Sequence, residues 1–441
     1  SHYKRKKGKF GLLHMNDKID VVALNLIKRY SFVTSRETDT IYFYNGKIYE
    51  SKNSLSIIKE ESEKLIPSCT ITNRNEIIGK IKAKTYKDLE SFDSNQFRYT
   101  LENGILDIQK MKLYPHTKNN LSKILIPCNF TIPKSNDLEK TLFYKYLKNS
   151  FTINNKIDYD NIQTVLEMCA AAFIRKNIDE KSFIMLGSGH NGKSVCLDYL
   201  SAMLGKENVA HIPLQVLSDD KFASARLESK LANIFSDLEK NELKHTGIIK
   251  SLSSGEPIYV QNKNQQGFNL YPFATLIFST NKFPKVFDQT QGFMRRFLII
   301  KWLRDFEKDP QRDSNLKEKL LSNKKEMDII FSNLMYIAKE IYKNNKFSHS
   351  KDWKVIQKMW NESADPVNDF IENYIIDSET SKTKRETYQF YKSTMYSQGT
   401  TPLGMGQFSK AFSEYYEESK THENRVWLNI GFKEPTQTKL I

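Results

Sequence analysis

Four short apolar runs follow one another in the middle of the chain, at residues 182–186, 230–235, 274–278 and 297–302. Each run stands beside a polar motif, and stretches with helical spacing separate the runs. Short buried runs that alternate with helices are typical of a parallel sheet covered by helices on its faces. The pattern therefore predicts a central α/β unit.

Helical spacing of apolar residues also precedes and follows this unit. Residues 137–149 and 160–176 carry apolar side chains three and four positions apart, and Asp160 is placed to cap the second helix. Residues 327–342 show the same spacing on a more charged background. We expect a helical approach to the central unit and a helical extension behind it.

The beginning of the chain is different, with strand-like runs at residues 40–44 and 105–109. Asn45-Gly46 and Asn103-Gly104 stand beside these runs, and both pairs favour the positive φ of tight turns. This pattern indicates a mixed α/β amino-terminal region.

The end of the chain combines helical stretches at residues 367–375 and 406–416 with residues 425–433, which we interpret as a strand followed by a glycine turn. This pattern favours a small winged-helix-like unit, in which Gln407, Lys410 and Arg425 would face DNA. A protein-docking role for the same unit is the alternative. Its aromatic residues Phe408, Phe412, Tyr415 and Tyr416 are expected in the core.

Five segments are therefore expected. They are a mixed α/β region (1–130), a helical collar for oligomerisation (131–178), an α/β core (179–310), a helical extension (311–365) and a winged-helix-like domain (366–441).

Composition narrows the class of protein. The 441 residues include 67 Lys and Arg against 52 Asp and Glu, so the net charge is +15 and favours polyanionic partners. No apolar run is long enough to span a membrane, and no secretory signal stands near the start. The four cysteines are far apart in sequence, so we expect reduced, buried thiols in a cytoplasmic protein, with the bacterial cytoplasm favoured.

The strongest motif is GSGHNGKS at residues 187–194, directly after the apolar run 182–186. It matches the phosphate-binding loop G-x-x-x-x-G-K-[ST] at every fixed position, in the strand–loop–helix context that the motif requires. Lys193 would reach the β- and γ-phosphates of ATP, and Ser194 would hold Mg²⁺. The expected nucleotide-binding residues are Gly187, Ser188, Gly189, His190, Asn191, Gly192, Lys193 and Ser194.

A second motif supplies carboxylates, because the apolar run at 230–235 leads into Asp237 and Glu239. Side chains two positions apart on a strand point the same way, so both can face one site. Asp237 would hold Mg²⁺ through water, and Glu239 would orient or deprotonate the attacking water. A solvated acidic turn is the alternative reading, and the phosphate loop about forty residues earlier favours the catalytic one.

Two further motifs complete a hydrolytic set. The run at 274–278 leads to Asn281, whose neutral amide can sense the γ-phosphate. Arg295 and Arg296 precede the run at 297–302, where an arginine can neutralise transition-state charge on a nucleotide bound by a neighbouring subunit.

Asp158-Tyr159-Asp160 forms a D-x-D, which is the minimal metal pair of a primase. Such a pair is common by chance and Asp160 is better explained as a helix cap, so no primase site is expected here.

Four segments follow one another in the order GSGHNGKS, SDLEKNE, KSLSSGEPIYVQNKNQQGFNLYPFATLIFSTNKFP and MRRF. This order resembles the superfamily 3 helicases, in particular the primase-helicases of satellite phages and poxviruses. It is also similar to replication initiators of bacterial mobile islands, such as staphylococcal pathogenicity islands and chromosome cassettes. The resemblance is strong over residues 180–302 and weaker at NGILD, residues 103–107. It implies an AAA+ core, a hexameric ring on DNA and an arginine finger acting in trans, for which Arg296 fits better than Arg295.

The resemblance also assigns a role to residues 258–270, two strand-like runs joined by a polar turn. Similar helicases place such a hairpin in the central channel, where it contacts single-stranded DNA. Lys263 would contact a phosphate there, with Asn262 and Asn264 beside it. An ordinary exposed hairpin would have the same pattern.

The acidic motif departs from the family's pattern in one respect. The two carboxylates of this motif are often adjacent in the family, whereas Leu238 separates Asp237 from Glu239 here, so the division of roles between them stays open.

These observations favour an ATP- and Mg²⁺-dependent replicative DNA helicase that initiates replication of a mobile genetic element. Its expected partners are DNA, five further copies of the chain and host replication proteins, with origin duplex bound by the carboxy-terminal domain. The alternatives are a P-loop ATPase that remodels protein–DNA complexes without separating strands, and a regulator in which nucleotide only gates DNA binding. The complete hydrolytic set of Asp237, Glu239, Asn281 and Arg296 argues against the regulator, because a simple gate does not need it.

Overall fold

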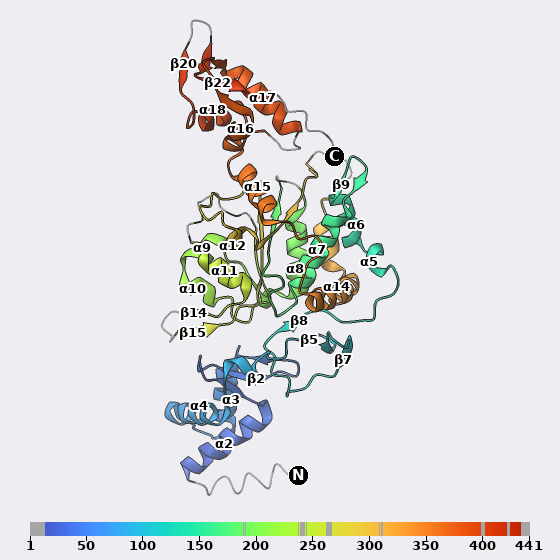
Figure 1. Cartoon of the computed structure of the whole chain (residues 1–441). Helices are drawn as coiled ribbons and strands as arrows, with labels where there is room; N and C mark the ends of the chain where they lie inside the picture. The colour runs from blue at the N-terminus through green and yellow to red at the C-terminus, as the bar shows by residue number, and fades with distance from the viewer. Residues whose placement is uncertain are drawn as a thin grey trace.

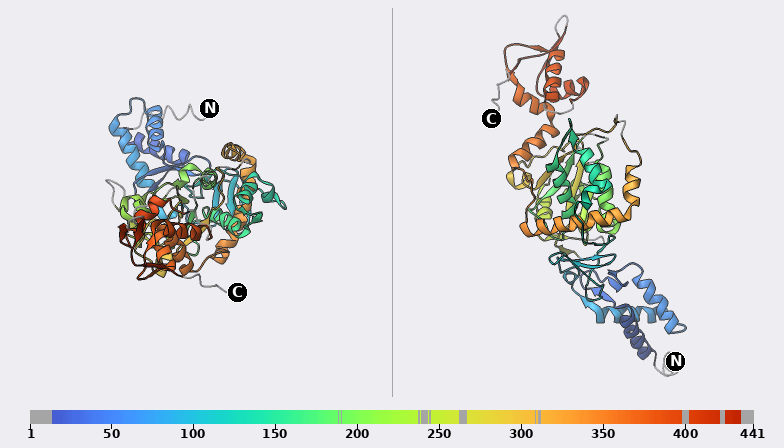
Figure 2. Two further views of the ribbon diagram at one scale, coloured as in Figure 1. Left: turned by 90° about the horizontal axis from the view of Figure 1, so that it is seen from above. Right: turned by 90° about the vertical axis from the view of Figure 1, so that its right-hand side faces the viewer.

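The computed structural model describes residues 14–187, 189, 191–236, 238, 243, 245–261, 267–307, 309, 312–397, 402–420 and 424–433. The molecule is elongated, with the amino-terminal region at one end, an α/β unit in the middle and the carboxy-terminal domain at the other end (Figures 1 and 2).

The amino-terminal region contains two small sheets. Helices α2 (Met15–Tyr30), α3 (Ser54–Leu65) and α4 (Ile71–Thr85) pack with a sheet ordered β3-β2-β1-β4. Its strands are β1 (Val33–Ser35), β2 (Ile41–Tyr44), β3 (Tyr49–Glu50) and β4 (Tyr86–Lys87). A short 3₁₀ helix, η1 (Leu89–Ser91), leads to the second sheet, ordered β7-β6-β5-β8. Its strands are β5 (Arg98–Leu101), β6 (Gly104–Asp107), β7 (Lys112–Tyr114) and β8 (Leu125–Ile126).

Both Asn-Gly pairs in this region contain a glycine with positive φ, as predicted. Gly46, in the connection between β2 and β3, has φ +104°, and Gly104, at the start of β6, has φ +151°. A Cβ at Gly104 would also lie 2.5 Å from the carbonyl oxygen of Tyr114, so this position requires glycine for space as well as for backbone conformation.

Arg175 connects this region to the central unit. Its guanidinium donates to Asp93 Oδ1 at 2.8 Å and to the carbonyl oxygen of Asn95 at 2.6 Å, and it stands over the ring of Tyr99. The side chains of Arg175 and Asp93 are 5% and 7% exposed, so the ion pair is shielded from solvent. Such a buried, multiply bonded arginine holds the two parts in one orientation.

The segment 131–178, which the sequence analysis predicts as a collar, contains α5 (Asp137–Lys140), α6 (Leu142–Ser150), the strands β9 (Thr152–Ile153) and β10 (Lys156–Ile157), and α7 (Tyr159–Ala171). The expected cap of α7 is wrong by two residues, because Asp158 and not Asp160 accepts the backbone N–H of Asn161, at 3.0 Å. The helix begins at Tyr159, so only Asp158 has the non-helical backbone of a cap.

The central sheet has the order β12-β13-β16-β11-β17, and every pairing in it is parallel. Its strands are β11 (Ser182–Leu186), β12 (Val209–Ala210), β13 (Ala232–Ser236), β16 (Thr275–Thr280) and β17 (Phe297–Lys301). The four apolar runs of the sequence thus form four of its five strands, which confirms the predicted α/β class with a parallel sheet.

Helices cover both faces of the sheet. One apolar cluster joins it to α7, α8 (Lys193–Leu204) and α14 (Lys324–Asn344). A second cluster joins it to α9 (Leu214–Asp219), α10 (Lys221–Ala225), α11 (Gly247–Ser254), α12 (Gln291–Met294) and α15 (Trp353–Ala364). The remaining elements are η2 (Lys206–Asn208), α13 (Leu316–Ser322) and a hairpin of β14 (Ile258–Val260) and β15 (Phe268–Leu270).

In the carboxy-terminal domain, the helices and the strands of the main sheet follow one another in the order helix, strand, helix, helix, strand, strand. Its helices are α16 (Pro366–Tyr374), α17 (Lys384–Ser397) and α18 (Met405–Phe412). Strands β19 (Lys382–Thr383), β20 (Glu418–Lys420) and β21 (Arg425–Trp427) form an antiparallel sheet ordered β19-β21-β20. A separate pair joins β18 (Ile375–Asp377) to β22 (Ile430–Phe432).

Two details of this domain differ from, or refine, the sequence interpretation. Residues 425–433 form two strands, with the turn at Asn429 (φ +58°), and Gly431 lies inside β22. Asparagine tolerates this left-handed conformation, which explains why the turn does not need the glycine. Phe408 and Phe412 are fully buried, as expected of core residues, whereas Tyr415 is 42% exposed.

We predict that Trp360→Ala lowers the stability of the central unit by about 3 to 5 kcal/mol. Trp360 is fully buried, stacks on Phe283 and donates its indole N–H to the carbonyl oxygen of Pro284 at 2.9 Å. Urea unfolding followed by circular dichroism would measure the change. Tyr396→Ala is the control, because Tyr396 is 61% exposed and should change stability by about 0.5 kcal/mol or less.

Candidate nucleotide-binding site

The GSGHNGKS motif lies at the carboxyl edge of the central sheet. Strand β11 ends at Leu186, and helix α8 begins at Lys193 after Gly192, which has φ +89°. The loop between them therefore lies at the amino-terminal end of a helix, where backbone N–H groups and the helix dipole attract anions.

Gly187 fits a very close approach of two backbone segments. A Cβ there would lie 2.2 Å from the carbonyl oxygen of Trp302 and 2.2 Å from Nδ2 of Asn191. Asn191 donates from that nitrogen to the same carbonyl oxygen at 3.1 Å. The loop is thus bound directly to the residue that follows β17, the neighbouring strand of the sheet.

The Lys193 ammonium is surrounded by oxygen atoms from three points of the chain. It donates to the carbonyl oxygen of Gly187 at 2.6 Å, to Oδ1 of Asn191 at 3.1 Å and to Oδ1 of Asn281 at 3.4 Å. Lys193 is 6% exposed. Asn281 follows β16, which pairs with β11, so the parallel sheet brings together two side chains that are 88 positions apart.

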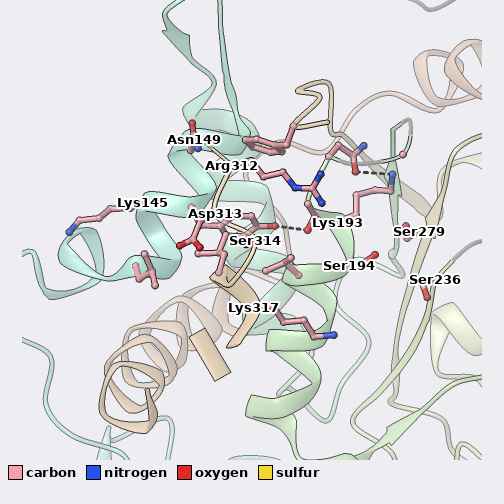
Figure 3. A pocket seen from close by; sticks show the side chains of 18 of the residues that line it. Lys145, Asn149, Lys193, Ser194, Ser236, Ser279, Arg312, Asp313, Ser314 and Lys317 are labelled. Atoms are coloured by element: carbon pink, nitrogen blue, oxygen red, sulfur yellow. Dashed lines mark hydrogen bonds between the residues drawn. The ribbon is translucent and has the colours of Figure 1, made fainter. Parts of the chain in front are cut away.

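A cavity of about 670 Å³ opens beside this group (Figure 3). Its volume is in the range of sites for small molecules and cofactors, and a nucleoside triphosphate fits within it. Ser194 and Ser236 are exposed to it, and Ser279 and Asn281 line the same side. The buried ammonium, the close glycine approach and the hydroxyl groups fit a polyphosphate.

Residues that the motif search missed form the opposite side of the cavity. The collar helix α6 contributes Lys145, Tyr146 and Asn149, and the segment before α13 contributes Arg312 and Asp313. In Figure 3 the Arg312 side chain extends toward Lys193, whereas the Lys145 side chain points away from it. Apart from the charge of Lys145 and Arg312, nothing in the sequence links these segments to a phosphate loop.

Tyr146 connects the collar to the loop itself. Its hydroxyl donates to the carbonyl oxygen of Gly192 at 2.8 Å, and a Cβ at Gly192 would lie 3.2 Å from its ring. Burial raises the pKa of Tyr146 well above its ordinary value, so the hydroxyl stays protonated and remains a donor.

Several expected site residues lie outside the described residues: Ser188, His190, Asp237, Glu239, Asn262, Lys263 and Asn264. The neighbours of Asp237 are described. Ser236 pairs with Ser279 in the sheet, and the backbone N–H of Leu238 donates to the carbonyl oxygen of Ser279 at 3.0 Å. This segment therefore leaves the sheet at the same edge as the phosphate loop.

Arg295 and Arg296 lie at the opposite edge of the central sheet, where its strands begin. They precede β17, whose first residue Phe297 pairs with Ser182, the first residue of β11. The phosphate loop follows the last residue of β11, so the strand separates it from the arginines by about 13 Å of extended chain. The structure thus does not bring these arginines to the cavity of their own chain.

The expected DNA-contacting residues of the carboxy-terminal domain are exposed. Gln407 and Lys410 lie on α18, and Arg425 begins β21, where it pairs with Glu418 at 3.4 Å. The domain lies at the end of the molecule opposite the amino-terminal region (Figure 1).

Three protein-family profiles match parts of the chain. Residues 22–173 match "D5 N terminal like", residues 362–437 match "Poxvirus D5 protein-like", and residues 185–296 match a family of unknown function, DUF5906.

Two viral relatives are named as helicases. One, from Acanthamoeba polyphaga mimivirus, is 20% identical over 67% of this chain and 32% of its own length. The other, from Invertebrate iridescent virus 6, is 24% identical over 52% of this chain and 24% of its own length. The chain thus spans about a third or less of these relatives.

Solved structures of the apo C-terminal region of NrS-1 are also similar. One match covers 94% of this chain and all of that chain, at 14% identity and a TM-score of 0.48. A second covers 92% and 98%, with the same identity and score.

The two D5-type profiles thus match segments on either side of the central sheet, and the relatives named as helicases are viral proteins. Among the described residues, no helix is long and apolar enough to cross a membrane.

We predict that Gly187→Ala weakens nucleotide binding by about 10-fold or more, because the added Cβ forces apart the loop and Trp302. Gly247→Ala is the matched control, since Gly247 lies at the start of α11 outside the cavity and a Cβ there meets no atom of the described residues within 4 Å. Titration with a fluorescent ATP analogue would measure both variants. Equal affinities for the two variants would contradict the close-approach argument.

Proposed function

We propose that this protein is an ATP-dependent DNA helicase of superfamily 3, with an AAA+ core, that works as a ring of six copies during replication of a mobile genetic element. The observation that carries the proposal is the contact of the Lys193 ammonium with Asn281 at the mouth of a cavity on the carboxyl edge of a parallel sheet. A lysine for the phosphates and an amide for the attacking water are two parts that nucleotide hydrolysis needs.

The residues around the cavity have separate roles in this proposal. Lys193 and the backbone N–H groups of residues 187–194 bind the triphosphate, and Asn281 orients water next to the γ-phosphate. Ser194 and Asp237 would hold Mg²⁺, which supplies charge neutralisation on the phosphate oxygens when it is bound. Glu239 would take the proton of the attacking water.

DNA is the proposed polyanionic partner. The net charge of +15 favours it, and the hairpin of β14 and β15 would contact single-stranded DNA through Lys263, with Asn262 and Asn264 beside it.

We further propose that the carboxy-terminal domain is a winged helix that binds origin duplex. The order α16, β19, α17, α18, β20, β21, with β21 between the other two strands, supports this topology. Helix α18 presents Gln407 and Lys410 to solvent, where a recognition helix would meet the major groove, and Arg425 lies on the wing strand β21.

The first test is strand displacement on DNA forks with a 3′ tail, a 5′ tail or no tail. We expect unwinding that requires ATP and a tail. We expect Lys193→Ala to lose hydrolysis and unwinding together, because the variant lacks the ammonium that would bind the β- and γ-phosphates. Lys358→Ala is the matched control, since Lys358 is an exposed lysine on α15 outside the cavity.

Normal ATP turnover by Lys193→Ala would refute the nucleotide assignment. If the wild-type protein hydrolyses ATP and opens no fork, with or without origin duplex, the remodelling ATPase replaces the helicase as the better description.

A second prediction separates ATP hydrolysis from DNA binding by the hairpin. We expect Lys263→Ala to keep basal ATP hydrolysis and to lose unwinding, because the residue would contact DNA and not the nucleotide. Parallel ATPase and fork assays would measure the two activities. Efficient unwinding by this variant would rule out the proposed role of the hairpin lysine.

A further inference from the structure

Three donors meet at one carbonyl oxygen beneath the phosphate loop. The Gly192 oxygen accepts from the Tyr146 hydroxyl at 2.8 Å, from the backbone N–H of Val195 at 2.9 Å and from that of Cys196 at 3.4 Å. The two backbone donors belong to the first turn of α8, whereas the hydroxyl comes from α6, 46 positions earlier in the chain. The carbonyl is therefore held both by its own helix and by a distant one.

The orientation of this carbonyl fixes the direction of the next N–H group. The described residues contain no cis peptide bond, and in a trans peptide the C=O and N–H groups point in opposite directions. The Gly192 oxygen points into α8, so the Lys193 N–H points out of the amino-terminal end of that helix, where the cavity lies. Backbone N–H groups in this position are those that bind phosphate oxygens.

Glycine makes this peptide easy to turn unless a side chain holds it. Gly192 has φ +89°, a conformation that glycine adopts without steric cost and with many alternatives of similar energy. A Cβ at this position would lie 3.2 Å from the Tyr146 ring, so the tyrosine fills the space that a side chain would occupy.

Helix α6 is held at both ends by other parts of the chain. Glu326, on α14, accepts the backbone N–H of Leu142 through Oε1 at 2.6 Å. At the other end, Arg304 donates to the carbonyl oxygen of Asn149 at 2.8 Å. Tyr146 lies between these two anchors and is 6% exposed. Its hydroxyl thus has a position that does not depend on the phosphate loop.

We propose that Tyr146 is a positioning residue, whose hydroxyl holds the peptide between Gly192 and Lys193 in the orientation that binds phosphate, so that docking of α6 and binding of phosphate stabilise each other. This inference rests on the proposed function, of which it uses only the binding of a triphosphate at residues 187–194. The effect is mutual because a contact that favours the phosphate-bound form of the loop is itself favoured by bound phosphate.

Tyr146→Phe removes the hydroxyl and keeps the ring. We expect the Kd values of ATP and of inorganic tripolyphosphate to rise by about 5- to 10-fold, which is the effect of one neutral hydrogen bond. The KM for ATP should rise by a larger factor than kcat falls, because the contact is present before the transition state. Calorimetric titration would measure both Kd values. Tyr144→Phe is the matched control, since Tyr144 lies on the same helix and does not line the cavity.

Tripolyphosphate separates two possible roles of the tyrosine. It has no base and no ribose, so its affinity reports on the phosphate loop alone. Weaker binding of ATP together with unchanged binding of tripolyphosphate would mean that Tyr146 contacts the nucleoside, and would overturn the inference. Unchanged affinity for both ligands would overturn it as well.

A second variant keeps the test open if Tyr146→Phe is too unstable to titrate, which urea unfolding would show. Arg304→Gln releases the carboxyl end of α6 from Asn149, and the Arg304 side chain is 24% exposed, so the variant should fold. We expect it to weaken tripolyphosphate binding in the same direction. Wild-type affinity in this variant would contradict the role of α6 docking.

Amide hydrogen exchange tests the mutual stabilisation. We expect tripolyphosphate to slow exchange in residues 142–150 of the wild-type protein by about 5-fold, and to slow it less in Tyr146→Phe. Residues 366–374, in the carboxy-terminal domain, are the internal control. Equal protection of α6 in both proteins would overturn the coupling. A wild-type protein that binds neither ligand would refute the proposed function, whereas one that binds both and opens no fork would lose only the helicase assignment.

Discussion

Burial of the Lys193 ammonium is the interaction on which the candidate site depends. An ammonium group removed from water without partners would cost several kcal/mol, so the fold must supply acceptors close to it. Gly187 and Asn191 supply two of them from the loop after β11, and Asn281 supplies the third from the end of β16. The position of the loop, the end of β16 and the approach to Trp302 are therefore fixed together. In the proposed function, phosphate oxygens are stronger acceptors for the same ammonium and would compete with these neutral groups.

The core of the site could be predicted from the sequence because its signals are local. The apolar runs are short and buried, and the fixed spacing of the phosphate loop leaves few other structures. The meeting of Lys193 with Asn281 follows from one further fact, that neighbouring parallel strands end at the same edge.

The rest of the site could not be predicted, because it depends on packing between distant segments. Tyr146 lies in an ordinary amphipathic helix, and only the docking of that helix brings its hydroxyl to Gly192. The ends of helices and strands could not be predicted either where two nearby residues can fill the same role. Asp158 and Asp160 can both cap a helix, and the true first residue of α7 decides between them. Asn429 and Gly431 can both make a turn, and the pairing of β18 with β22 decides that case.

The contribution of α6 to the cavity has a consequence for any shortened version of the protein. Lys145, Tyr146 and Asn149 precede the central sheet by more than thirty residues, although they form one of its cavity walls. A fragment that begins at β11 would contain the phosphate loop, the acidic motif, the asparagine motif and the arginine pair, and yet have an open, incomplete pocket that lacks the Tyr146 contact with Gly192. The smallest fragment with a complete pocket must therefore start before α6, and the unit defined by motifs is shorter than the unit defined by packing.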